Sequence, residues 1–221
     1  MAMTILVTGG TGYIGGEVID QLLARGHTVH TTVRDKAKSE PRLRARWSDA
    51  GERLAVFEAD LMSDAGWAEA NVGCDAVAHV ASPFPMAMPK DKDELVVPAR
   101  EGTLRALEFA DKAGIKRFVQ TSSAAAIAYG QPEKDHFTHL DWTNLTAGVP
   151  PYIESKTVAE RAARDWVATK APRNLRHQLA WIKAWSFVLK KLWQADGQSD
   201  GKKLLLIRPA KQHVRALRRK R

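Results

Sequence analysis

The sequence predicts an α/β fold built on a doubly wound parallel sheet, followed by an atypical basic C-terminal tail that we expect to be helical. Short apolar runs alternate with segments of helical periodicity throughout residues 1–168. Glycine follows two of the predicted helices, at Gly26 and Gly114, where a left-handed residue commonly ends a helix. Strands separated by helices lie parallel with right-handed crossovers, so any binding crevice should lie at the carboxyl ends of the strands.

The predicted elements follow one another in a regular order. Each strand is read from a short apolar run, and each helix from a segment with helical periodicity. Ser39, before a Glu-Pro step, is the expected N-cap region of the second helix. The expected strands are Thr4–Thr8, Thr28–Val33, Arg53–Glu58, Ala76–Ala81 and Arg117–Ser122, and the expected helices are Tyr13–Arg25, Pro41–Ala50, Ala65–Asn71 and Glu94–Ala113.

Chain length, cysteine count and the lengths of the apolar runs limit the classes of protein to which this chain can belong. The chain has 221 residues, which suits one large α/β domain, and a single cysteine, Cys74, which excludes an internal disulfide and a multi-cysteine metal site. This cysteine usage fits a cytoplasmic protein. The first residues show neither a basic region nor an unbroken apolar run, so we expect no signal peptide and no membrane anchor, and no stretch reaches the roughly 20 apolar residues of a spanning helix.

The positive charge is concentrated in the tail. Residues 1–168 contain 19 Lys and Arg against 23 Asp and Glu, whereas residues 169–221 contain 15 against 2. Three of the seven tryptophans, Trp181, Trp185 and Trp193, also lie there. We therefore expect no nucleic-acid partner, and we place the boundary between residues 1–169 and an atypical tail, residues 170–221.

The strongest local signal is the stretch TGGTGYIGG, between the first predicted strand and the first predicted helix. Gly10, Gly12 and Gly15 match G-x-G-x-x-G, and Gly9 with Gly12 and Gly15 also matches G-x-x-G-x-x-G. A diphosphate can approach the backbone N–H groups and the positive end of a helix only where no Cβ intervenes. The pattern predicts a dinucleotide-binding (Rossmann) turn, against the alternative of a glycine-rich turn without a ligand.

The end of the second predicted strand bears on which dinucleotide is bound. It reads TTVRDKAK, in which Arg34, with Lys36 and Lys38 behind it, suits the 2′-phosphate of NADP. Asp35 keeps open the NAD reading, in which a carboxylate holds the ribose hydroxyls, and a solvated charged loop is the third interpretation.

A tyrosine stands four residues before a lysine in VPPYIESKTVAE. On a helix, Tyr152 and Lys156 would share one face, close enough for the ammonium to act on the phenol. Many helices carry such a pair without catalysing anything, so the pair alone decides nothing.

Taken with the motifs in order along residues 4–168, the chain resembles the extended short-chain dehydrogenases/reductases. It is most similar to the dihydroflavonol reductase and cinnamoyl-CoA reductase group within them. The matching segments are VTGGTGYIGG, TVRD, the pair Asp60-Leu61, VAHVASP, PAREGTLRALEFA, FVQTSSAAA and YIESKTVAE.

The resemblance implies a catalytic trio of Ser123, Tyr152 and Lys156. Tyr152 would protonate the oxygen of a carbonyl substrate during hydride transfer, with its pKa lowered by the nearby ammonium and the oxidised cofactor, while Ser123 holds that oxygen. It also implies a set of residues that contact NADP: Gly9, Thr11, Gly12, Tyr13, Ile14, Gly15, Arg34, Lys38, Asp60, Leu61, Ala81, Ser82, Pro83, Tyr152 and Lys156.

Other candidates are weaker, and we expect no metal site. The run DHFTHLD offers His136 and His139 between two aspartates, but its spacing fits no common metal site, and a solvated loop is the alternative. His79, inside a predicted strand, is expected to be a core histidine with one satisfied nitrogen, and Cys74 a small buried hydrophobe.

Beyond Lys170 the chain departs from the family, whose members continue into another parallel strand and a mostly helical substrate lobe. GKKLLLIRPA, residues 201–210, is a candidate for that strand. Residues 175–194 are predicted to form a basic amphipathic helix packed loosely on the domain, and the terminal RALRRKR to be disordered. We expect limited proteolysis to cut first after Thr169.

Three classes of function are compatible with these sequence features. The first is an NADP-dependent reductase of aldehydes, ketones or dihydroflavonol-like compounds, with a nucleotide-sugar epimerase or dehydratase as the alternative enzyme. The second is a dinucleotide-binding protein without catalysis, and the third is a tail-dependent binder of membrane surfaces or acidic partners. Whether the chain forms a homodimer, and whether it is active without the lobe, stays open.

Overall fold

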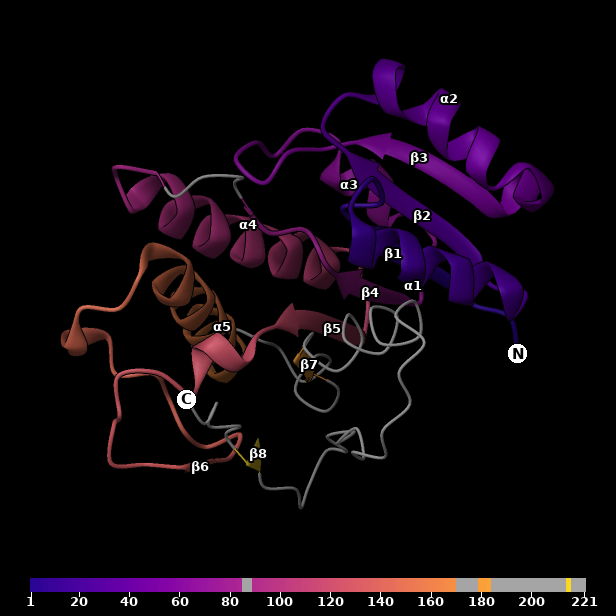
Figure 1. Cartoon of the computed structure of the whole chain (residues 1–221). Coiled ribbons are helices and arrows are strands. Elements are labelled where there is room, and N and C mark those ends of the chain that lie inside the picture. The colour runs from indigo at the N-terminus through magenta and orange to yellow at the C-terminus, as the bar shows by residue number, and fades with distance from the viewer. Residues whose placement is uncertain (85–88, 170–178, 184–213, 216–221) are drawn as a thin grey trace, which may run out of the picture.

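The computed structural model describes residues 1–84, 89–169, 179–183 and 214–215. Its main sheet has the strand order β3-β2-β1-β4-β5-β7, with every neighbouring pair parallel (Figure 1). The strands are β1 (Thr4–Thr8), β2 (Thr28–Val33), β3 (Leu54–Glu58), β4 (Ala76–His79), β5 (Arg117–Ser122) and β7 (Leu179–Lys183). The helices are α1 (Tyr13–Ala24), α2 (Lys36–Arg46), α3 (Trp67–Asn71), α4 (Asp93–Lys112) and α5 (Pro151–Thr169). Two short strands, β6 (His136–Phe137) and β8 (Val214–Arg215), pair antiparallel.

Helices cover both faces of the sheet, as the doubly wound prediction requires. Alternate residues of β1 point to opposite faces, so Ile5 and Val7 pack with Ile19 of α1 and Leu43 of α2. Leu6 lies in the core on the other face. That second core contains residues of α3, α4 and α5, among them Trp67, Leu107 and Ala163. Because both faces are buried, the central strand β1 is a nearly continuous apolar run, TILVT, rather than an alternating one.

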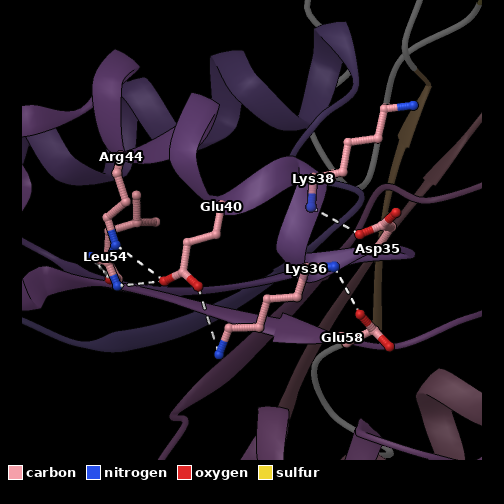
Figure 2. A network of polar contacts seen from close by, with 7 residues as sticks. All are labelled: Asp35, Lys36, Lys38, Glu40, Arg44, Leu54 and Glu58. Atoms are coloured by element: carbon pink, nitrogen blue, oxygen red, sulfur yellow. Dashed lines mark hydrogen bonds and ion pairs between the residues drawn. The ribbon is translucent and has the colours of Figure 1, made fainter.

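The predicted start of the second helix is wrong. Helix α2 begins at Lys36 rather than near Pro41, and its N-cap is Asp35 rather than Ser39. The Asp35 carboxylate accepts a hydrogen bond from the Lys38 backbone N–H at 2.9 Å, which satisfies one of the free donors of the first turn (Figure 2). The later part of the predicted helix is a 3₁₀ segment, Ser48–Arg53, interrupted at Gly51.

The prediction of a helix across residues 175–194 is also wrong at residues 179–183. These residues form β7, which pairs parallel with β5 in a register that places Leu179 opposite Phe118 and Lys183 opposite Ser122. The edge of β5 would otherwise expose a row of unpaired N–H and C=O groups, and a strand satisfies them where a helix cannot. The rest of that helix and the alternative strand at 201–210 lie outside the described residues. Of the terminal RALRRKR, predicted to be disordered, Arg215 is the last residue of β8, and residues 216–221 lie outside the described residues. The domain boundary near Thr169 stays a prediction.

Within the described ranges, no helix combines the length and the apolar character that crossing a bilayer demands.

Candidate active site

The glycine-rich turn after β1 is shaped by close backbone contacts. Gly9 has a φ of +74°, a conformation that a side chain would strain, and its carbonyl accepts the Gly12 N–H at 3.0 Å. A Cβ on Gly15 would stand 2.3 Å from the Gly9 oxygen. The third glycine of the motif therefore lets α1 begin directly against the turn.

The turn and α1 fit a dinucleotide diphosphate. Gly12 is the N-cap of α1, and no side chain caps the helix start. The first turn of α1 also carries no acidic residue, so nothing there repels an anion. Thr11, Gly12 and Tyr13 are exposed, and Ile14 is half-buried. This is the arrangement in which backbone N–H groups and the helix dipole bind phosphate.

The charged side chains near the end of β2 are of two kinds: carboxylates that accept backbone hydrogen bonds, and exposed cations. The Asp35 carboxylate caps α2, and Glu58 at the end of β3 accepts the Lys36 backbone N–H at 2.8 Å (Figure 2). Arg34 and the side chain of Lys38 are exposed, and within the described residues neither makes a side-chain hydrogen bond or ion pair. Because the cations are exposed and the carboxylates already accept hydrogen bonds, this end of β2 favours an anionic ligand.

Thr8, the last residue of β1, joins the glycine turn to the end of β4. Its buried hydroxyl accepts the backbone N–H groups of Val80 and Ala81, both at 2.9 Å, and lies 3.0 Å from Nδ1 of His79. With two bonds accepted, this hydroxyl donates its proton to Nδ1, so His79 is neutral with the proton on Nε2. A Cβ on Gly9 would meet Ala81 at 3.1 Å, which shows how closely the turn Ala81-Ser82-Pro83 approaches the glycines.

The pair Asp60-Leu61 lies just beyond β3, at the same edge of the sheet. Asp60 accepts the Met62 N–H at 2.7 Å through its side chain and the Trp67 indole N–H at 2.9 Å through its carbonyl. Leu61 packs against Gly102 of α4, where any Cβ would meet it at 2.6 Å. These contacts hold the loop that the resemblance assigned to the adenine.

Ser123, Tyr152 and Lys156 come together where β5 ends and α5 begins. Ser123 is buried, and its Oγ accepts the Ala125 N–H at 3.1 Å. Its hydroxyl faces the phenol of Tyr152 and acts to lower the pKa of that phenol. The Lys156 ammonium lies 5.6 Å from the centre of the Tyr152 ring. The serine thus caps its own backbone and also lies beside the tyrosine.

Burial controls the protonation of these groups. Burial raises the pKa of Tyr152 above its ordinary value, the Ser123 hydrogen bond opposes that rise, and the neighbouring Tyr129 adds to it. In the free protein the pKa of Tyr152 is therefore raised, whereas the resemblance implied that the ammonium and the oxidised cofactor together lower it. Burial lowers the pKa of Lys156 to about 8, and burial together with the Lys156 charge lowers the pKa of His79 to about 3.

Ser122, the hydroxyl that could be confused with Ser123, points elsewhere. It donates to Glu160 of α5 and is buried. A small cavity beside it is lined by His79, Ala81, Ser82, Thr103, Gln120, Thr121, Ser122, Lys156 and Ala159. The cavity therefore connects the turn after β4 with Lys156.

The weaker candidates have structural roles. His79 is buried and its Nδ1 is satisfied by Thr8, as expected. Cys74 is half-buried rather than buried, and desolvation raises the pKa of its thiol to about 12. In the loop before α5, Asp141 is ion-paired with Lys134 and accepts the Thr138 N–H at 2.6 Å. Among the described residues, no group of three or more His, Cys, Asp or Glu side chains could hold a metal ion.

Two residues at the site were missed from the sequence. Thr8 carried one available signal, a polar residue ending an otherwise apolar strand. Phe84 carried none: its ring stacks edge-on against Tyr152 with centroids 5.4 Å apart and is 76% exposed.

The profile of the NAD dependent epimerase/dehydratase family matches residues 5–176. Among curated proteins, the chain is 38% identical to a cinnamoyl-CoA reductase of Medicago truncatula over 177 residues, covering 74% of this chain and 52% of that protein. It is 33% identical to the dihydroflavonol 4-reductase of Hordeum vulgare over 176 residues, covering 74% and 49%. The chain thus spans about half the length of these curated relatives.

Solved structures of reductases also resemble this chain. The yeast methylglyoxal/isovaleraldehyde reductase, crystallised with NADPH, aligns with a TM-score of 0.72 at 25% identity, covering 82% of this chain and 57% of that one. Vestitone reductase from alfalfa (Medicago sativa) aligns with a TM-score of 0.67 at 28% identity, covering 82% and 56%. The profile match, the glycine turn and the parallel sheet lead to one conclusion: this chain belongs to the NAD dependent epimerase/dehydratase family.

Proposed function

We propose that this chain is an NADP-dependent oxidoreductase that reduces the carbonyl group of a small aldehyde, ketone or dihydroflavonol-like compound. The observation that carries the proposal is the meeting of Ser123, Tyr152 and Lys156 at the same sheet edge as the glycine turn. The relatives support it, because their names describe reductases and one solved structure contains NADPH.

The cofactor would be held along the carboxyl edge of the sheet. The diphosphate would bind the backbone of Gly9 to Gly15 at the start of α1, and Arg34 and Lys38 would bind the 2′-phosphate. Asp60 and Leu61 would face the adenine, while the turn Ala81-Ser82-Pro83 would lie along the nicotinamide half. When bound, NADPH supplies the hydride.

Three side chains would handle the substrate oxygen and its proton. Ser123 donates a hydrogen bond that strengthens as negative charge develops on that oxygen. Tyr152 gives its phenolic proton to the same oxygen, so the carbonyl becomes an alcohol and the tyrosine becomes a phenolate, which water reprotonates. Lys156 stabilises that phenolate by its charge and would also hold the nicotinamide ribose.

The test is carbonyl-dependent oxidation of NADPH by the purified full chain, using methylglyoxal, aromatic aldehydes and a dihydroflavonol. Tyr152→Phe should reduce the rate by about 10²-fold or more, because the proton donor is lost, with NADPH affinity close to that of wild type. NADPH binding without turnover on any carbonyl would instead identify a dinucleotide-binding protein. Retained turnover in Tyr152→Phe would assign the proton donor to another group.

Cofactor preference has its own test. Arg34→Ala should weaken NADPH binding about tenfold or more while leaving NADH binding unchanged, because it removes charge-assisted contacts to the 2′-phosphate only. Arg42→Ala is the matched control, since Arg42 is an exposed arginine on α2, the helix that follows Arg34. Equal affinity of wild type for NADPH and NADH would overturn the assignment.

A further inference from the structure

A buried carboxylate on α5 is not used by the reaction proposed above. Glu160 has no exposed surface, although a buried carboxylate is costly unless it is fully paired. Its Oε2 accepts the hydroxyl of Ser122, and its Oε1 accepts Arg164 Nη2 at 2.6 Å. Both oxygens therefore have partners, one from the neighbouring strand and one from its own helix.

Through Arg164, Glu160 is also connected to a third segment of the chain. Arg164 Nη2 also donates to the His139 carbonyl at 3.3 Å. The guanidinium groups of Arg161 and Arg164 each lie 4.9 Å from the centre of the Trp142 ring. Glu160 thus connects the end of β5, helix α5 and the loop that leads into α5.

The Glu160 contacts lie on the same side of α5 as the proposed catalytic groups. Tyr152, Lys156 and Glu160 are spaced four residues apart, so they lie along one side of α5. Ser122, the last residue of β5, and Ser123, which follows it, face this helix at two places: Ser122 at Glu160, and Ser123 at Tyr152. The two contacts are eight residues apart, roughly 12 Å along the helix axis.

Two such contacts constrain the helix more than one does. A rotation or slide of α5 by a fraction of an ångström would carry Tyr152 away from the serine. The second contact opposes both movements, because a hydrogen bond weakens steeply with angle and distance.

We propose that Glu160, bonded to Ser122 and braced by Arg164, is a positioning residue that sets the placement of Tyr152 against Ser123. This inference rests on the proposed function for its kinetic consequence, but the geometry can be measured without any turnover.

The direct readout is the ionisation of Tyr152, because the Ser123 hydrogen bond lowers its pKa. The chain has only three tyrosines, so the near-ultraviolet absorbance of tyrosinate, compared with the Tyr152→Phe variant, isolates this one. Ser122→Ala should raise the pKa of Tyr152. It should also lower kcat for a carbonyl substrate between about tenfold and a hundredfold, with KM for NADPH near that of wild type.

Two further variants separate positioning from charge and from general loss of stability. Glu160→Gln keeps the shape and can still bridge Ser122 and Arg164, so the Tyr152 titration should stay close to that of wild type. Asn71→Ala removes another buried hydrogen bond, from Asn71 Nδ2 to the Trp67 carbonyl at 2.7 Å, far from α5. It should lower stability without moving the titration.

The outcomes are distinguishable. An unchanged Tyr152 titration in Ser122→Ala, with stability lowered as in Asn71→Ala, would show that Glu160 is merely structural and overturn the proposal. A shift in Glu160→Gln equal to that in Ser122→Ala would also overturn it, because charge rather than placement would then be responsible. If Ser122→Ala does not fold, Glu160→Asp, which shortens the reach to Ser122, must raise the pKa of Tyr152 or the proposal fails. Absence of carbonyl reduction in wild type refutes the proposed function alone, and the titration then decides the positioning role.

Discussion

Gly15 is the position where a single added methyl group should have the clearest effect. A Cβ there would stand 2.3 Å from the Gly9 carbonyl oxygen, about 0.7 Å inside the 3.0 Å below which real Cβ contacts essentially do not occur. The obstacle is backbone, so no side chain can rotate away. Either the start of α1 or the Gly9 peptide must move.

The cost follows from that displacement. Overpacking of this kind costs about 1–3 kcal/mol, and each kcal/mol lowers Tm by roughly 2–4 °C in a protein of this size, so Gly15→Ala should lower Tm by about 2–12 °C. NADPH binding should weaken as well, because the displaced peptide belongs to the proposed phosphate site.

Gly12→Ala is the matched control, because it separates folding from binding. Its Cβ would lie 3.3 Å from the Gly9 oxygen, and Gly12 has an ordinary φ of −80°. The free protein should therefore tolerate it, while the new methyl group stands where the diphosphate must approach. We expect an almost unchanged Tm and NADPH affinity lower by about tenfold or more.

The assay is thermal unfolding followed by circular dichroism without cofactor, since a bound ligand would raise Tm by mass action. Cofactor titration by fluorescence then gives the affinities. An unchanged Tm for Gly15→Ala would refute the close contact between α1 and the turn. Normal NADPH affinity in Gly12→Ala would refute the phosphate site.

Two further predictions concern stability. Thr8→Val should destabilise the protein by about 2–6 kcal/mol in urea unfolding, because the Val80 and Ala81 N–H groups lose their buried acceptor at about 1–3 kcal/mol each; a loss below about 1 kcal/mol would contradict that role. Because the pKa of His79 is lowered to about 3 in the folded protein from 6.5 when unfolded, its contribution is fully present above pH 6.5 and is lost as the pH falls towards 3. Between pH 7 and pH 5 this loss amounts to about 2 kcal/mol, so His79→Gln should show a correspondingly flatter dependence of unfolding free energy on pH, and equal slopes would show that His79 does not titrate in this way.

The sequence by itself determined the sheet and the position of its ligand turn. Apolar runs alternating with helical patterns indicate a parallel sheet covered by helices, and the spacing of Gly9, Gly12 and Gly15 suits one turn between strand and helix. The spacing of Tyr152 and Lys156 likewise follows from helical geometry alone. These features are local, so a pattern along the chain is enough to indicate them.

The tertiary structure decided what depends on contacts between distant residues. Ser122 and Ser123 are adjacent hydroxyls in the sequence, and only the tertiary structure shows that Ser122 bonds to Glu160 whereas Ser123 faces Tyr152. Asp35 could have faced a ribose, but its carboxylate caps α2. Residues 179–183 have a helical pattern yet form a strand, because the open edge of β5 offers backbone partners that no local preference could reveal. In each case the competing local choices differ by little, and a contact with a distant segment is large enough to decide between them.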